Sequence, residues 1–437
     1  MTAEVGILNR MGVALAADSA VTIGSLFNQK VYNSASKLFS LSKHHPVGIM
    51  IYGSADFMGV PWEIIIKSFR KKIGITKFDT LKEYSITFFD YLQTDQNLLL
   101  QYAESQQVRR IFNSHLIDFL NSINQDLNNQ SDDAPTEEMV KSAIEDKLEV
   151  ILERLEGIEY VENLPSDFQE AFLKTHSETI KSVIENNIYI ELDDLSINNF
   201  LQFAVQVFSR NIFSDVISGI VISGYGETEI FPSLYEYEVE GLFSNFLIKE
   251  SKEVTKIGSE SNEEFTTASV RAFAQKEMVQ MFMHGMDPTL GNTLLEILDE
   301  SLTNFYPEQL EKLLETEFTD EQKDKLQGLG NIFMEELFYK LEGLQYENFV
   351  YPIVDTVDLL PKEELAAMAE ALVNLTSFKR KVTIDAETVG GPIDVAVISK
   401  GDGFIWIKRK HYFNPELNYH FFQKYLKGGV DDVSSNV

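Results

Sequence analysis

The sequence predicts an α+β protein in which one β-core, covered by helices, carries two long helical insertions. Strand-like runs occur in three separated parts of the chain, residues 1–54, 216–258 and 392–409. Between them lie two long segments in which apolar residues recur at helical spacing. Both segments are too long for ordinary connections, so a single core interrupted twice is the economical interpretation.

These patterns divide the chain into six segments. They are core (1–74), helical insertion (75–214), core (215–264), helical insertion (265–360), the last helix and closing strands of the core (361–427), and a flexible tail (428–437).

The first core segment begins with a hairpin. Glu4–Leu8 and Gly12–Ala17 are strand-like runs with a tight polar corner at Asn9-Arg10 between them. After short extended pieces, the continuous apolar run Val47–Gly53 is typical of a buried strand. From Ala55 to Gly74 apolar residues fall at helical spacing, which predicts a helix.

The later elements follow the same two periodicities. Leu81–Leu98, Leu100–Leu120, Thr136–Glu162 and Leu195–Phe213 are predicted as helices of the first insertion. Strands are then expected at Ile217–Gly224, Glu229–Glu240, Leu242–Lys249 and Glu253–Gly258. Residues 265–378 are expected to be helical, with interruptions at prolines, before strands Pro392–Ser399 and Phe404–Arg409 close the core.

The composition excludes several classes of function. A net charge of −31 disfavours nucleic acid and anionic membranes as partners, because phosphates need cations to neutralise them. The chain has no cysteine, which excludes thiolate nucleophiles and thiolate metal sites and fits a reducing compartment. No apolar run reaches the ~20 residues of a membrane span, and the histidines are too scattered for a metal site. We expect a cytoplasmic protein without metal or cofactor.

The first residues suggest a nucleophile. Thr2 directly follows Met1, and removal of Met1 would give Thr2 a free α-amine beside its hydroxyl. Such a pair can serve as nucleophile and base in acyl transfer. Asp18 sits where the second strand-like run of the hairpin ends.

Several motifs resemble those of one family. Thr2-Ala-Glu-Val-Gly, Gly12-Val-Ala-Leu-Ala-Ala-Asp18, Lys37-Leu-Phe and Gly53-Ser-Ala-Asp56 are similar to the start of proteasome β-subunits and the bacterial HslV protease, which are N-terminal-nucleophile (Ntn) hydrolases. Gly390-Gly391 and the strands after it resemble the end of that family. The resemblance covers roughly residues 2–72, 215–262 and 362–412, and implies an αββα sandwich of two antiparallel sheets.

The resemblance also implies a role for each matching residue. Thr2 would attack a peptide carbonyl, with its own α-amine as base; Lys37 would add positive charge beside it, and Asp18 would hold Lys37. The backbone amide of Gly53 would donate to the oxyanion, and Ser259 would contact the terminal amine. The family's amine-orienting pair precedes Gly390-Gly391; here Asp385 and Thr388 are each displaced by one position.

We therefore expect a threonine peptidase that acts on peptides or proteins and assembles as a homo-oligomer; an ATPase or regulatory partner stays open. Two alternatives remain. One is a non-catalytic scaffold or regulatory protein on the same fold, and the other is a small-molecule amidase.

Overall fold

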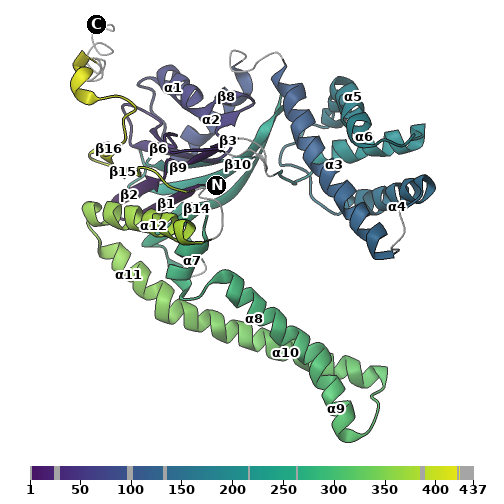
Figure 1. Ribbon diagram of the computed structural model, residues 1–437. Coiled ribbons are helices and arrows are strands. Elements are labelled where there is room, and N and C mark those ends of the chain that lie inside the picture. The colour runs from purple at the N-terminus through teal and green to yellow at the C-terminus, as the bar shows by residue number, and fades with distance from the viewer. Residues whose placement is uncertain are drawn as a thin grey trace.

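A computed structural model describes residues 2–23, 30–95, 102–130, 135–214, 217–261, 264–383, 389–420 and 423. Two five-stranded antiparallel sheets form its centre (Figure 1). Buried side chains from both sheets meet in one apolar cluster that includes Leu15, Met50 and Ile398. The two sheets are therefore packed face to face, in an arrangement compatible with a sandwich.

The first sheet is built around the N-terminal hairpin, in the strand order β14-β1-β2-β15-β16. Its strands are β1 (Ala3–Asn9), β2 (Gly12–Ala17), β14 (Ala268–Ala274), β15 (Asp394–Ser399) and β16 (Gly403–Lys408). Every residue of β1 and β2 is buried. Side chains alternate along a strand, so one face of β1 packs on helices and the other faces the second sheet.

The second sheet has the order β11-β10-β9-β6-β5. Its strands are β5 (Leu38–Ser40), β6 (Val47–Gly53), β9 (Ser218–Gly224), β10 (Ser233–Phe243) and β11 (Phe246–Lys256). The chain turns between β10 and β11 at Ser244 and Asn245, which both have positive φ, as a two-residue hairpin turn requires. β11 is one strand where the sequence suggested two, because this turn ends β10 later than expected.

Helices cover the outer face of each sheet. α1 (Trp62–Ile73) and α2 (Leu81–Thr94) pack on the second sheet in one apolar cluster. α12 (Lys362–Val382) and α7 (Glu277–His284) pack on the first sheet in another. Three short ribbons and a 3₁₀ turn complete the core: β3 (Val21–Ile23) with β4 (Lys30–Tyr32), β7 (Asp56–Phe57) with β8 (Val60–Pro61), β12 (Glu260–Ser261) with β13 (Glu264–Phe265), and η4 (Pro415–Leu417).

The first helical insertion begins later than the sequence suggested. α2 lies on the sheet, so the separate block starts at α3 (Ala103–Gln130) and continues through α4 (Glu137–Glu156), α5 (Phe168–Asn187) and α6 (Asp194–Ser209). These four helices share an apolar cluster of their own, which reaches the sheet at Phe243 and Ile248. The periodicity of α2 indicated a helix, but not which surface it would cover.

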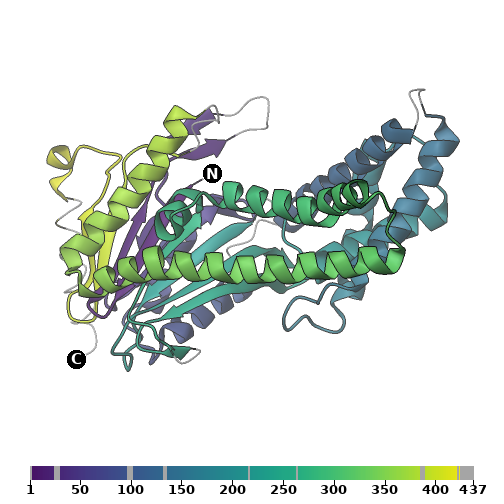
Figure 2. The same ribbon diagram turned by 90° about the horizontal axis from the view of Figure 1, so that it is seen from below.

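The second insertion is a helical arm that extends away from the sheets (Figures 1 and 2). One side consists of α8 (Pro288–Glu300), the π-turn η2 (Ser301–Phe305) and α9 (Tyr306–Leu314). The other consists of α10 (Asp320–Gln345), the π-turn η3 (Tyr346–Val350) and α11 (Tyr351–Leu359). Each π-turn directly precedes a helix whose second residue is proline, Pro307 or Pro352. Because proline has no backbone N–H, it cannot make the usual helical hydrogen bond, and the helix widens at this point.

One core strand falls inside the segment expected to be helical. Ala268–Ala274 forms β14 and pairs with β1 along its whole length. Its burial is mixed, with Ala268 and Phe273 buried and most other residues half exposed, because β14 is an edge strand. The expected tail at residues 428–437 lies outside the described residues. In the described parts of the chain, no helix combines the length and apolar character needed to cross a bilayer.

Asn9 ties the N-terminal hairpin to the end of the arm. Its Nδ2 donates to the carbonyl oxygens of Val357 (2.8 Å) and Leu360 (2.9 Å), and its Oδ1 accepts from the amide of Met11 (2.8 Å). We expect Asn9→Ala to lower the free energy of unfolding by about 2–3 kcal/mol, because buried groups lose their partners.

The adjacent Arg10 provides the control. It forms an ion pair with Asp358 (2.5 Å), but its side chain is 48% exposed. Arg10→Ala should therefore change the free energy of unfolding by no more than about 1 kcal/mol, with both variants measured by urea titration. Equal losses for the two variants would contradict this account of Asn9.

Candidate active site

Thr2 lies at the start of β1, between the two sheets. Side-chain alternation places Thr2 and Glu4 on the same face as Leu8, which packs toward the second sheet, whereas Ala3 packs toward α12. The carbonyl of Thr2 accepts a hydrogen bond from the amide of Gln275, just beyond β14 (3.1 Å). The Thr2 backbone is thus held at the end of the sheet.

Lys37 brings its ammonium group to the Thr2 hydroxyl. Lys37 Nζ donates to Thr2 Oγ1 at 3.0 Å and to Asp18 Oδ1 at 2.5 Å. Thr2, Asp18 and Lys37 are all buried. The carbonyl of Lys37 accepts from the amide of Ile51 (2.9 Å), which fixes the residue against β6 of the second sheet. The two sheets therefore each contribute one side of this contact.

Asp18 is held by three backbone amides as well as by Lys37. Its Oδ1 accepts from Ala3 (3.2 Å), and its Oδ2 accepts from Ala20 (3.2 Å) and Gly390 (3.0 Å). Buried charges need such partners, because removal from water is costly. The carboxylate is fully engaged and its position is fixed by three different segments of the chain.

This arrangement suits activation of a hydroxyl nucleophile. Because Lys37 donates to the oxygen of Thr2, the hydroxyl proton is free to point to a base elsewhere. The ammonium also stabilises negative charge that develops on that oxygen as the proton leaves. These polar groups lie in a buried environment, where their interactions are strong.

Gly53 ends β6 in a conformation that only glycine adopts without strain. Its φ is +77°, and an added Cβ would lie 2.3 Å from the carbonyl oxygen of Ile217. Amide directions alternate along a strand, so the Gly53 N–H points to the same edge as the Ile51 N–H, which donates to Lys37. The Gly53 N–H therefore points toward the same edge of β6 as Lys37.

The structure does not bring Ser259 to Thr2. Ser259 Oγ donates to the carbonyl of Lys256 (2.8 Å), and its own carbonyl accepts from Thr266 (3.0 Å), two residues before β14. That end of β14 pairs with Asn9, at the opposite end of β1 from Thr2. Ala274, the last residue of β14, pairs with Ala3, and Gln275 just beyond it binds Thr2. Ser259 was expected beside Thr2 because the sequence analysis did not recognise strand β14.

Asp385 and Thr388 lie outside the described residues. Gly390, immediately beyond that segment, is close to the site: its amide binds Asp18, and its carbonyl accepts from the amide of Ser19 (3.1 Å).

Glu4 is a site residue that the sequence analysis did not single out. Both of its carboxyl oxygens are buried without a hydrogen-bond partner. Burial raises the pKa of Glu4 well above its usual range, against the attraction of Lys37, and the Asp18 carboxylate raises it further. Burial without a hydrogen-bond partner therefore favours the protonated form of Glu4. The available signal was an acidic residue inside an otherwise apolar buried strand.

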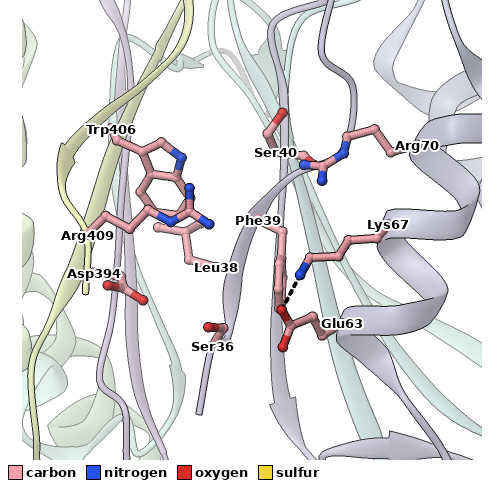
Figure 3. A pocket seen from close by; sticks show the side chains of 10 residues that line it. All are labelled: Ser36, Leu38, Phe39, Ser40, Glu63, Lys67, Arg70, Asp394, Trp406 and Arg409. Atoms are coloured by element: carbon pink, nitrogen blue, oxygen red, sulfur yellow. Dashed lines mark hydrogen bonds and ion pairs between the residues drawn. The ribbon is translucent and has the colours of Figure 1, made fainter. Parts of the chain in front are cut away.

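A small pocket opens near this centre but does not contain it (Figure 3). It lies between the edge strands β5 and β16 and helix α1, with Trp406 and Arg409 on one side and Lys67 and Arg70 on the other. Ser36 lines it, but neither Lys37 nor Thr2 does. The pocket adjoins the segment that carries Lys37.

Comparisons with known proteins add little to this geometry. No protein-family model matches the chain, and no curated protein is similar to it. One solved structure with similarity is the "Anbu (Gly-1) mutant from Hyphomicrobium sp. strain MC1". The match has 8% identity and a TM-score of 0.24, and covers 100% of this chain and 98% of that one. So low a TM-score supports no statement about residues or activity.

Among the described residues, no three His, Asp or Glu side chains gather in a way that could hold a metal ion.

The Lys37–Asp18 pair generates a stability prediction. Lys37→Met should lower the free energy of unfolding by about 3–5 kcal/mol, because the Asp18 carboxylate stays buried without its cation. Asp18→Asn should also destabilise the protein. The double variant should lose clearly less free energy of unfolding than the sum of the two single losses, because both charges are then removed and none is buried without a partner. Additive losses in urea titrations would show that the two residues are not coupled.

Glu4 generates a pH prediction. The unfolded chain releases the Glu4 proton near the ordinary value of 4.5, while the folded chain keeps it. Above that pH the folded state binds more protons, so its stability falls by up to about 1.4 kcal/mol per pH unit until the folded-state pKa is reached. Glu4→Gln removes this loss, so the stability of the variant relative to the unmodified protein should rise between pH 4.5 and 7.5.

The exposed residue Glu63 supplies a control, because Glu63→Gln should give a difference that hardly depends on pH. A Glu4→Gln difference that is constant over the same pH range would mean that Glu4 is ionised in the folded protein.

Proposed function

We propose that this protein is a threonine peptidase of the Ntn-hydrolase type, with the αββα fold of that class, and that Thr2 is its nucleophile after removal of Met1. One observation carries the proposal: Lys37 Nζ lies 3.0 Å from Thr2 Oγ1 while Asp18 holds the lysine. The sequence resemblance names the same three residues independently of the geometry. Peptides or proteins are the proposed substrates, in a cytoplasmic homo-oligomer.

The first step would form an ester. The free α-amine of Thr2 takes the proton of its hydroxyl, and Oγ1 attacks the carbonyl carbon of the scissile bond. The Gly53 amide and the Lys37 ammonium stabilise the oxyanion. The α-ammonium then gives its proton to the leaving amine, the C–N bond breaks, and an acyl ester on Thr2 remains.

The second step would hydrolyse that ester. Water gives a proton to the α-amine and attacks the ester carbonyl. The second tetrahedral intermediate collapses, Oγ1 leaves and regains the proton, and a carboxylic acid is released. An ordinary α-amine has a pKa of about 7.7–8.0, so the rate should rise with pH through this range.

The charges around Thr2 favour this chemistry. Burial favours the neutral form of Glu4, and in that form the positive charge of Lys37 is balanced by Asp18 alone. Ionisation of Glu4 would add a negative charge near the position where the oxyanion forms. Asp385 or Thr388 is proposed to orient the amine, as the resemblance implies.

Removal of Met1 is the first requirement to test. Two preparations that differ by one residue can be made by cutting a removable N-terminal fusion either before Met1 or before Thr2. Only the preparation that begins with Thr2 should hydrolyse peptide substrates, because in the other the Thr2 nitrogen is an amide and cannot act as base. Equal activity of the two preparations would rule out the α-amine as the base.

Substitution of Thr2 tests the nucleophile in a screen of peptide and small amide substrates. Thr2→Ala should lower kcat/KM by at least about 10³-fold, and Thr2→Ser should keep part of the activity, because it keeps the hydroxyl. If only small amides are hydrolysed, the amidase alternative holds. A folded protein that begins with Thr2 and hydrolyses nothing would favour the scaffold alternative.

A further inference from the structure

The helical arm exposes apolar surface that nothing in the described chain covers. α9 and α10 have no buried residue, and α8 buries only Gly291. Yet Leu329 and Tyr339 of α10 are 63% and 77% exposed. Both views show the arm projecting beyond the sheets, with its two sides running along each other (Figures 1 and 2). Contiguous exposed apolar surface of this kind marks an interaction site.

Each side of the arm already uses one face to pack on the other. In α10, half-buried residues recur at helical spacing, as at Leu326, Gly330 and Leu337. An added Cβ on Gly330 would lie 3.5 Å from Leu302 on the opposite side, so this face is the inner one.

A second apolar stripe runs along the outer face of each side. In α10 it consists of Leu329, Ile332 and Tyr339. The spacings of three and seven residues are those of a coiled-coil seam. Gly343 falls at a position of the same seam, and no atom lies within 4 Å of the place where its Cβ would stand.

α8 carries a matching stripe at Leu290, Leu294 and Ile297, which are 62%, 46% and 55% exposed. Their spacing of four and three residues also belongs to a seam. The arm is thus a pair of helices in which both members carry an inner and an outer apolar face. This is the pattern of a helix inside a bundle, where it meets two neighbours.

We propose that the outer part of the helical arm, residues 288–350, pairs with the same part of a second copy of this chain to form a four-helix bundle about a two-fold axis. A second copy supplies the same stripes, which satisfies the self-complementarity of a two-fold interface. The six stripe residues are on average about 60% exposed, and would bury up to about 800 Å² per copy. That is the share of each partner in a standard interface.

The polar residues of the arm argue against a membrane as the occupant. Glu and Asp far outnumber Lys between residues 288 and 350, and this segment has no Arg. Helices that lie on membranes have the opposite bias, toward Lys and Arg. The proposal does not depend on the peptidase chemistry, because no residue of the arm touches the Thr2 site.

The test compares the oligomeric state of the full chain with that of the double variant Ile332→Glu and Tyr339→Glu. Both side chains are largely exposed, so the variant should keep its helix content by circular dichroism. The unmodified chain should sediment as a dimer, or as an assembly of dimers, at micromolar concentration. The variant should weaken the arm contact at least about 100-fold, because the new carboxylates would be buried against one another.

The double variant Gln327→Glu and Asn331→Glu is the matched control. It adds the same charge at exposed positions of the same helix, away from the stripe, and should leave the assembly unchanged. A monomeric unmodified chain, or a stripe variant that assembles as the unmodified chain does, would overturn the proposal. Binding of a monomeric chain to phosphatidylcholine vesicles, lost in the stripe variant, would overturn it in favour of a membrane.

Discussion

The buried ion pair between Lys37 and Asp18 is the constraint on which the centre of this structure depends. It joins the first sheet, through Asp18 after β2, to the second sheet, through Lys37 before β5. The amides of Ala3, Ala20 and Gly390 bind the same carboxylate, so the start of β1, the turn after β2 and the segment before β15 converge on one group. A buried pair with this many partners is costly to break and specifies one arrangement of the sheets. That arrangement leaves one donor of Lys37 directed at Thr2.

The same pair explains why Glu4 differs from Asp18 although both are buried carboxyl groups within the same hairpin. Asp18 has the lysine and three amides, whereas Glu4 has no partner among the described residues. One cation cannot compensate two buried carboxylates equally, so burial raises the pKa of the group without hydrogen bonds and favours its protonated form. With Glu4 protonated, the site holds one positive charge, one negative charge and one neutral acid.

The sequence predicted the parts of this site that local pattern encodes. The hairpin of β1 and β2 and the apolar strand β6 ending at Gly53 could be read directly, because short strands and a tight turn leave strong signals. The grouping of Thr2, Asp18 and Lys37 came from the family resemblance and not from local pattern. Ser259 was misplaced because β14 was hidden: an edge strand with half-exposed residues has weak alternation, and its register on β1 is a long-range property. Glu4 could not be assigned a state from its position alone, since its pKa depends on what surrounds it.

In the helical segments too, local pattern predicted the elements but not the contacts they make. Periodicity identified their helices, but not that α2 would cover a sheet or that the arm would leave an apolar face uncovered. Which surface a helix meets is decided by the partner, and a partner outside the chain leaves no mark in periodicity except a second apolar face.

The measurement that tests the central claim most directly is covalent labelling of the chain that begins with Thr2 by a peptide epoxyketone or vinyl sulfone, followed by tandem mass spectrometry. The account predicts one adduct, on Thr2. It also predicts that labelling is lost in Thr2→Ala and slowed in Lys37→Met, because the ammonium that stabilises the developing charge is absent. An adduct on another residue, or a folded chain that resists both kinds of probe, would contradict the assignment of Thr2 as the nucleophile.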